Sequence, residues 1–221
     1  MIDVIVIGGG YAGMAAALQL LRVRRSVLIL DAGERRNRFA RHSHGFLTQD
    51  GEDPAVIAAR ARAELERYDP DLFQADRALQ VTGNKDNFTV ETESGARYAA
   101  RRVLLATGVR DTLPDLPGLA ERWGRSVFHC PYCHGFELAM GPIGLLANGP
   151  EAIPHLSLLA DFGQVTLLTN GAFPLDAETR TRLGALGLGI DERRVTGLDG
   201  PLDGPVEIGF DSGAPRRLNG L

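Results

Sequence analysis

The sequence predicts an α/β protein with two Rossmann-like domains built on parallel sheets, the first carrying an inserted antiparallel β-meander. Three observations support this prediction. A glycine-rich turn at residues 8–13 follows an apolar strand and precedes a helix. A weaker strand–turn–helix–strand pattern occurs at residues 143–168. Between them, three short strands separated by glycine-containing turns predict the meander.

The N-terminal pattern indicates a bound dinucleotide. Residues 2–7 are mostly β-branched, as in a buried parallel strand, and residues 8–13 follow as Gly-x-Gly-x-x-Gly. The first glycine permits a tight turn, the second lets the backbone approach a pyrophosphate, and the third lets helix and strand pack closely. A second strand, residues 27–30, ends in a carboxylate placed for ribose hydroxyls. The candidate cofactor-binding residues here are Gly8, Gly10, Tyr11, Ala12, Gly13 and Asp31.

The rest of the first domain favours FAD over NAD as the occupant. A helix is predicted from Asp53 to about Tyr68, with proline at its first position. The meander strands are predicted at residues 79–82, 88–91 and 97–99. Such a meander is a common insertion in flavin-binding Rossmann domains. An apolar strand at residues 103–105 then ends at the carboxyl edge of the sheet, which makes Thr107 and Gly108 candidate cofactor contacts.

The only two cysteines, Cys130 and Cys133, form a Cys-x-x-Cys pair between His129 and His134. Thiols at this spacing can close a small disulfide, and neighbouring proton acceptors favour the reactive thiolate. The pair is therefore a candidate redox centre.

The pair has four other interpretations. Cys-x-x-Cys-His also attaches c-type haem, but in exported proteins, and no signal segment precedes the first strand. A zinc site would need four ligands from residues 129–134, whereas structural zinc sites usually draw on separated segments, so no metal is expected. Glutaredoxins carry Cys-Pro-Tyr-Cys near the start of a small domain, not after a nucleotide-binding pattern. Two buried structural cysteines are the remaining alternative.

Composition excludes several classes of function. The 221 residues suffice for one large or two small domains, and no apolar stretch approaches a membrane span. A net charge of -4 argues against a nucleic-acid partner. Two cysteines in a chain of this length suggest a reducing, cytoplasmic location.

Residues 8–13, Asp31, residues 106–108 and the Cys130 to Cys133 pair occur in the order and at the separations typical of one family. The chain resembles the low-molecular-weight thioredoxin reductase family of FAD-dependent pyridine-nucleotide-disulfide oxidoreductases. The likeness covers nearly the whole chain.

The resemblance implies an FAD-binding domain at residues 1–111 and a pyridine-nucleotide-like domain, carrying the redox pair, at residues 112–221. It places Val81 beside the adenine and implies a homodimer. Family members return to the FAD domain through a Gly-Asp motif, and this return is expected to be absent from the chain.

The second domain departs from the family in its nucleotide site. Ala147 replaces the first glycine of its turn, and Pro150 removes a backbone donor. Residues 169–171 offer neither arginine nor carboxylate at the strand end, so NADP and NAD both lack their usual ribose contact. The predicted elements are a strand at 143–146, a turn at 147–152, a helix at 153–162 and a strand at 165–168.

A second departure is His134, which stands where family reductases have aspartate. The pattern with His134 resembles the branch of the family that contains the gliotoxin and holomycin dithiol oxidases. These enzymes close disulfides on small natural products and pass electrons to oxygen. Imidazole titrates near neutrality and can take a thiol proton during oxidation. The resemblance implies that Cys130 meets the substrate, Cys133 faces the flavin and His134 is the acid/base.

The roles of the histidines have alternatives. His134 could act only by orienting its loop, and His129 is expected to have a structural or electrostatic role. His42 and His44 are expected near the flavin or the substrate entrance, with no functional role as the alternative.

The sequence therefore favours an FAD-dependent oxidase of dithiols with oxygen as acceptor. One alternative is an NADPH-dependent disulfide reductase acting on a thioredoxin-like protein or a small disulfide. An alternative of another class is a non-catalytic redox-sensing or binding module derived from a truncated flavoprotein.

Overall fold

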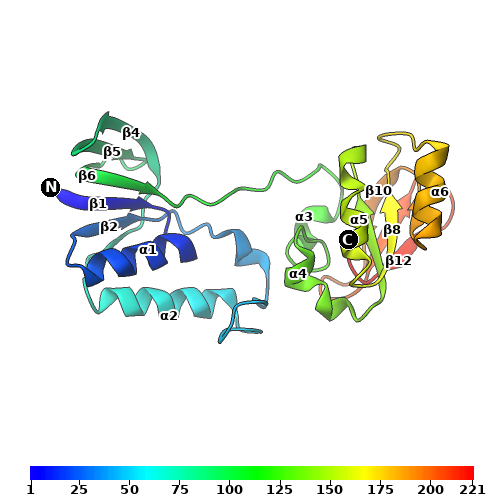
Figure 1. The fold of residues 1–221 in the computed structure, drawn as a ribbon, viewed down its shortest axis with the longest axis horizontal. Helices are drawn as coiled ribbons and strands as arrows, with labels where there is room; N and C mark the ends of the chain where they lie inside the picture. The colour runs from blue at the N-terminus through cyan, green and yellow to red at the C-terminus, as the bar shows by residue number, and fades with distance from the viewer. The chain divides into compact units, whose positions relative to one another are not determined.

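The computed structural model describes residues 1–221, which divide into two compact units. The first unit contains residues 1–38 and 52–111, and the second contains residues 39–51 and 112–221. Segment 39–51 is thus flanked in sequence by the first unit but packs with the second. Both units combine helices with parallel strands, which confirms the predicted fold class (Figure 1).

The strands of the first unit are β1 (Ile2–Ile7), β2 (Val27–Leu30), β3 (Phe73–Gln74), β4 (Ala78–Asn84), β5 (Asn87–Thr92) and β6 (Arg97–Leu105). They form one sheet in the order β3-β2-β1-β6-β5-β4. Strands β3, β2, β1 and β6 are parallel to their neighbours, and β4 and β5 form the antiparallel meander. The chain order reverses beside β1, which is where dinucleotides bind in such sheets.

Strand β6 corrects one sequence prediction. Two separate strands were expected at residues 97–99 and 103–105, but the structure has one continuous strand. Ala100 joins the two parts, because it pairs with Phe88 of β5 on one side and with Ile2 of β1 on the other. No glycine or proline interrupts the strand.

Both faces of the first sheet are covered. Helices α1 (Tyr11–Arg22) and α2 (Pro54–Glu66) pack against one another and lie together beside β1 and β2 (Figure 1). Val6 packs in the cluster formed with these helices, whereas Ile5 packs with Val90 of the meander. Burial on both faces explains the β-branched run of β1. Helix α2 begins as predicted, with the Asp53 carboxylate accepting a bond from the backbone N–H of Ala55 at 2.6 Å.

The strands of the second unit are β7 (Pro142–Leu146), β8 (Gln164–Leu168), β9 (Gly189–Asp191), β10 (Val195–Asp199), β11 (Val206–Phe210) and β12 (Arg216–Leu218). Strands β7, β8 and β9 form a parallel sheet, and β10, β11 and β12 form an antiparallel one. No element after Leu168 is predicted from the sequence; the structure adds β9 to β12 and helix α6 (Ala177–Ala185).

The helix predicted at residues 153–162 is shorter than expected. A 3-10 turn, η3 (Pro150–Ala152), precedes helix α5 (His155–Leu159). Pro150 and Pro154 lack the backbone N–H groups that an α-helix uses. The first backbone hydrogen bonds of residues 149–156 therefore join residues three apart, as in a 3-10 helix.

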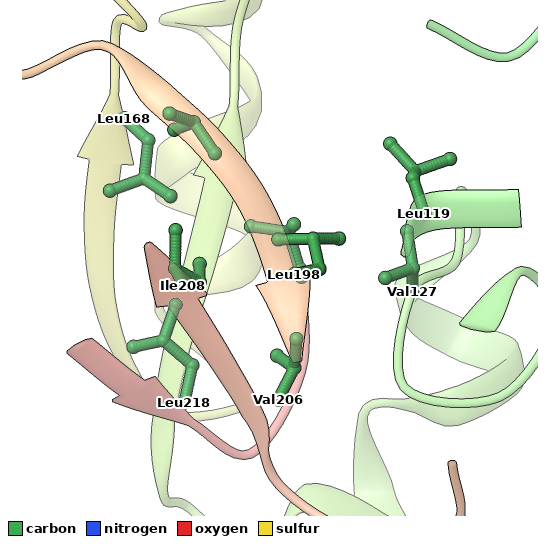
Figure 2. Close-up of a cluster of buried hydrophobic side chains, with 9 residues drawn as sticks. Leu119, Val127, Leu168, Leu198, Val206, Ile208 and Leu218 are labelled. Carbon is green, nitrogen blue, oxygen red and sulfur yellow. The ribbon is translucent and has the colours of Figure 1, made fainter. Parts of the chain in front are cut away.

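An apolar cluster connects elements of the second unit. Figure 2 shows Leu168 at the end of β8 beside Ile208 and Leu218 of the antiparallel strands. A buried ion pair adds to this contact, because the Asp191 carboxylate lies 2.7 Å from Arg193 and 3.3 Å from Arg216. Hydrogen bonding from Arg193 is the largest cause that lowers the pKa of Asp191. β9 is thus joined to β12.

Short helices surround the Cys-x-x-Cys pair. These are α3 (Leu119–Arg122), α4 (Pro131–His134) and η2 (Phe136–Leu138), with η1 (Arg36–Phe39) leading into segment 39–51. None of the helices in the chain has the length and apolar character needed to cross a bilayer.

Candidate redox site and dinucleotide cradle

The glycine turn of the first unit is fixed by close backbone contacts. Gly8 has a φ of +108°, and a Cβ there would lie 2.3 Å from the carbonyl oxygen of Ala106. A Cβ on Gly13 would lie 1.9 Å from the carbonyl oxygen of Gly8. Neither position accepts a side chain, so α1 starts directly beside β1 and β6, as the sequence pattern implies.

Gly10 has a different environment. It is the N-cap of α1 with a φ of -72°, and no side chain caps the helix. A Cβ at Gly10 would meet nothing within 4 Å. The space in front of the first turn, which is formed by Tyr11 and Ala12, is therefore open, and the first backbone N–H groups of a helix favour a phosphate.

Neighbouring segments extend this cradle. The Tyr11 hydroxyl donates to the carbonyl of Pro54 at 3.1 Å and accepts a bond from the Asn37 side chain at 3.2 Å. Thr107 lies beside Gly8, and Gly108 has a φ of +64°. The structure thus brings Tyr11, Thr107 and the glycine turn to the same edge of the sheet.

A cavity of about 330 Å³ lies at the end of β2. Asp31 borders it, and its carboxylate accepts a bond from the backbone N–H of Gly33 at 3.2 Å. The Arg62 guanidinium lies 4.2 Å from the centre of the Phe73 ring. The lining residues are Asp31, Ala32, Gly33, Arg62, Phe73, Gln74, Ala75, Asp76, Arg77 and Glu93.

Val81 does not line this cavity. It lies within β4, opposite Val90 of β5. If this cavity receives the adenosine, residues 74–77 border it instead of Val81. The sequence offered no periodic signal for that short segment.

The redox motif occupies a single helical turn. Cys130 is the N-cap of α4, Pro131 is its first residue, and Cys133 and His134 follow within the same helix. The backbone N–H of Cys133 donates to the carbonyl of Cys130 at 3.2 Å. Both cysteines are thiols and not a disulfide. The structure therefore brings together the three residues predicted to be catalytic.

The two thiols have different surroundings. Cys133 and His134 line a cavity of about 350 Å³ with His42, His44 and Glu137. Cys130 lines a more apolar cavity of about 550 Å³, which His129 also borders. A reagent that reaches one sulfur thus meets a different set of side chains from a reagent that reaches the other.

His134 packs between a backbone carbonyl and an aromatic ring. Its Nε2 lies 3.3 Å from the carbonyl oxygen of Gly124, and its ring stacks on Phe128 with centroids 4.7 Å apart. Its Nδ1 is buried and has no hydrogen-bond partner. Burial lowers the pKa of His134, against smaller opposing effects of nearby carbonyls and Glu137. If Nε2 carries the proton toward Gly124, Nδ1 is the atom that can accept one.

Segment 39–51 forms one wall of the Cys133 cavity. Arg41 pairs with Asp203 at 2.6 Å, and His44 Nε2 lies 3.4 Å from Glu137 Oε1. Phe39 packs on Gly124, where an added Cβ would lie 2.8 Å from the Phe39 Cβ. His42 and His44 thus share a cavity with the redox motif.

Sequence reasoning missed several polar residues of this cavity. Glu137 follows His134 by three residues, so helical spacing provided a signal for it. Ser126 lines the cavity with a buried, unpartnered hydroxyl, and Asp203 comes from the loop between β10 and β11. These two are brought in by tertiary structure and have no local signal.

The second glycine turn lacks the openness of the first. A Cβ on Gly149 would lie 2.2 Å from a carboxylate oxygen of Glu151, so that carboxylate lies against the turn. The Asn170 side chain accepts a bond from the backbone N–H of Val195 at 2.7 Å and thereby joins the end of β8 to β10. The exposed Glu151 side chain thus lies beside the second turn, and Asn170 makes a structural contact.

The cradle beside Asp31 and the Cys130 to Cys133 pair define a dinucleotide-binding protein with a dithiol centre. A family model described as pyridine nucleotide-disulphide oxidoreductase matches residues 2–183. The chain belongs to that family and is similar to its thioredoxin reductases.

Curated and solved relatives agree with this assignment. The probable thioredoxin reductase of Arthroderma benhamiae is 43% identical over 150 residues, which are 65% of this chain and 37% of that protein. Thioredoxin reductase tcpT of Claviceps purpurea is 35% identical over 97% of this chain and 70% of its own length. The crystal structure of the oxidoreductase from Agrobacterium tumefaciens has a TM-score of 0.93 and 47% identity, covering 100% of this chain and 73% of that one. The chain thus spans only part of the length of its relatives.

We expect the pKa of His134 to lie below 6.5, because burial penalises the imidazolium. Proton NMR titration of the five histidines would measure it, with His134→Gln to assign the signal. Near pH 6 the unfolded chain then binds more protons than the folded one, so the free energy of unfolding should fall as the pH drops through 6.5. That part of the pH dependence should disappear in the variant. A pKa at or above 6.5 would contradict the expectation.

Proposed function

We propose that the chain is part of an FAD-dependent oxidase of small dithiols, with Cys130 and Cys133 as its redox pair and oxygen as its final acceptor. The observation that carries this proposal is the presence, in one cavity, of Cys133 and His134, whose buried Nδ1 lacks a hydrogen-bond partner. The overall reaction converts a dithiol and O₂ into a disulfide and H₂O₂, so two electrons and two protons leave the thiols and reach oxygen.

The first unit is proposed to hold FAD. The open space at Gly10, the uncapped start of α1 and the acidic end of β2 fit a pyrophosphate and a ribose. Bound FAD would supply the chemistry that reoxidises the Cys130 and Cys133 dithiol, by taking its electron pair and passing it to O₂. The proposed contacts are Gly8, Gly10, Tyr11, Ala12, Gly13, Asp31, Thr107 and Gly108.

The thiol steps are assigned to the chain's own residues. In the oxidised pair, a substrate thiolate attacks the sulfur of Cys130, and the sulfur of Cys133 leaves as a thiolate. The second substrate thiolate then displaces Cys130 and releases the substrate as a disulfide. His134 Nδ1 accepts a proton from a thiol in this sequence. The different surroundings of the two thiols support this division of labour.

An NADPH-dependent disulfide reductase is the second candidate. The printed names of the relatives favour it, and in that case the partner is a thioredoxin-like protein or a small disulfide. The carboxylate of Glu151 against the second glycine turn disfavours it, since a nucleotide phosphate would meet a like charge. In either case we propose a homodimer in the cytoplasm.

The complete protein should purify yellow with bound FAD. Gly10→Val adds a side chain in the open space before α1, so FAD affinity should fall about tenfold or more, since a hydrogen bond to a charged group contributes roughly 1.5–3 kcal/mol. Unfolding of the flavin-free protein should change little, because the φ of Gly10 suits any residue. Fluorescence titration with FAD measures the affinity.

Gly184→Val is the matched control, because Gly184 also has nothing within 4 Å of a Cβ but lies on α6. Equal FAD binding by Gly10→Val and the wild type would contradict the cradle. A colourless complete protein would favour the non-catalytic module.

The two thiols should differ in their effect on the flavin spectrum. Cys130→Ser should abolish turnover but keep a long-wavelength absorbance band, because the Cys133 thiolate remains beside the oxidised flavin. Cys133→Ser should lose both. A band that survives only in Cys133→Ser would reverse the assignment of the two thiols.

Dithiols should be better electron donors than NADPH. Under anaerobic stopped-flow conditions, dithiothreitol should bleach the flavin quickly and millimolar NADPH slowly. The reason is that each missing charge-assisted contact to NADPH costs roughly 1.5–3 kcal/mol, or about ten- to a hundredfold in affinity. Oxygen should restore the colour and yield H₂O₂. Glu151→Gln should speed bleaching by NADPH. Rapid bleaching of the wild type by micromolar NADPH would establish the reductase instead.

A further inference from the structure

His44 lies between two carboxylates in the wall of the Cys133 cavity. Its Nε2 is 3.4 Å from Glu137 Oε1, and its Nδ1 is 3.6 Å from Asp50 Oδ1. The same Asp50 oxygen accepts a bond from the backbone N–H of Gly45 at 2.8 Å. An imidazole with an acidic group near each nitrogen can carry a proton on either one.

The packing of segment 39–51 fixes His44 in this place. The Arg41 to Asp203 pair and the contact of Phe39 with Gly124 anchor the segment on the second unit before His44. The side chain of His44 is only 23% exposed, whereas that of Asp50 is 66% exposed. The side chain of Glu137 is 46% exposed, so the array meets solvent at Glu137 and at Asp50, and His44 lies between them.

His134 needs an outlet for the proton that it takes. Burial disfavours the charged imidazole, so a proton received from a thiol is not stored there. A second thiol can be deprotonated only after the first proton has left. Glu137, three residues further on, is the carboxylate whose charge acts on His134. It is also the group that contacts His44.

We propose that Glu137 takes the proton of His134 to solvent in each turnover, with His44, itself held by Asp50, positioning the Glu137 carboxylate. His44 acts through Glu137 and does not touch the reacting sulfur atoms. The inference rests on the proposed oxidase function. Over one cycle, two protons leave the substrate thiols and two are taken up when oxygen becomes H₂O₂, so protons are exchanged with solvent and none is gained.

Other charged groups face the same cavity and contribute to its pH dependence. They come from segment 39–51, from the loops after α3 and β10, and from α4 and η2. These residues are Arg41, His42, His44, Arg125, Cys133, Glu137 and Asp203. Arg41 and Arg125 both pair with Asp203, so neither contacts the proposed route.

His42 provides a matched control on the same segment. It lines the same cavity, but its Nδ1 lies 3.0 Å from the carbonyl oxygen of Gly51. His42→Gln therefore removes an imidazole from the wall without interrupting the contact of His44 with Glu137.

The test compares His44→Gln, Glu137→Gln and His42→Gln in the complete protein with FAD bound. Oxygen uptake with dithiothreitol is measured from pH 6 to 9. General acid–base groups contribute about 10²–10⁴-fold to rate, and a group acting through one of them should contribute less, so kcat should fall about tenfold in the first two variants with KM unchanged. His42→Gln should stay within about twofold of the wild type. Because one route is interrupted in both cases, the double variant of His44 and Glu137 should be no slower than the slower single variant.

NMR titration of His134 separates proton transfer from simple electrostatics. Glu137→Gln should lower the pKa of His134 and His44→Gln should raise it, since the charge of Glu137 favours the imidazolium and that of His44 disfavours it. If His44 acted only through its charge, His44→Gln would shift the pH dependence of kcat along with the pKa of His134 and leave the maximal kcat unchanged. Wild-type kcat in His44→Gln, or an unchanged pKa of His134 in both variants, would overturn the proposal.

The outcomes also distinguish the proposal from the function on which it rests. A wild-type protein that takes up no oxygen with any dithiol would overturn the oxidase, and the proton route with it. If the wild-type protein oxidises dithiols but the kcat losses of the two single variants multiply in the double variant, only the shared proton route is overturned.

Discussion

Close backbone contact at glycine positions fixes both halves of the candidate site. In the first unit, a Cβ on Gly13 would lie 1.9 Å from the carbonyl oxygen of the first glycine of the turn. In the second unit, a Cβ on Gly135 would lie 2.6 Å from the carbonyl oxygen of Pro131 and 2.4 Å from the Phe162 ring. Because neither position accepts a side chain, the start of α1 and the end of α4 are held by backbone packing. The placement of the phosphate turn and of the redox motif follows from that constraint.

Charge is distributed unevenly around the redox motif. In its cavity, Arg41 is paired with Asp203, and His44 with Glu137, so these groups can be ionised without an isolated charge. His134 is the exception, because its ring has a backbone carbonyl on one nitrogen, an aromatic ring on one face and no partner at Nδ1. His134, whose burial disfavours the imidazolium, thus lies in a cavity whose other charged groups are paired with one another. Such a contrast suits an imidazole that must both accept and release a proton.

The sequence predicted what depends on local spacing. Residues 2–31 and the helix after Asp53 follow period, capping and glycine rules, and the structure agrees within a few residues. Tertiary contacts were not predictable in this way. Arg41 and Asp203 are 162 residues apart, and nothing in either local pattern indicates that they meet. The sequence predicted His42 and His44 near the flavin or the substrate entrance, but nothing in it indicated that segment 39–51 packs with the second unit. It also did not indicate that β6 is one strand, whose pairing changes from β5 to β1 at Ala100.

The second unit combines a nucleotide-binding architecture with side chains at its turn that differ from those of the first unit. Strands β7, β8 and β9 retain the parallel order, and a turn still follows β7. At that turn, however, the carboxylate of Glu151 lies against Gly149, and the Asn170 side chain is used to hold β10. A phosphate at this turn would have to overcome a like charge, whereas the turn after β1 presents open space and backbone donors. The second unit positions Cys133 and His134 on one short helix, and the turn after β1 has the open space that a pyrophosphate needs.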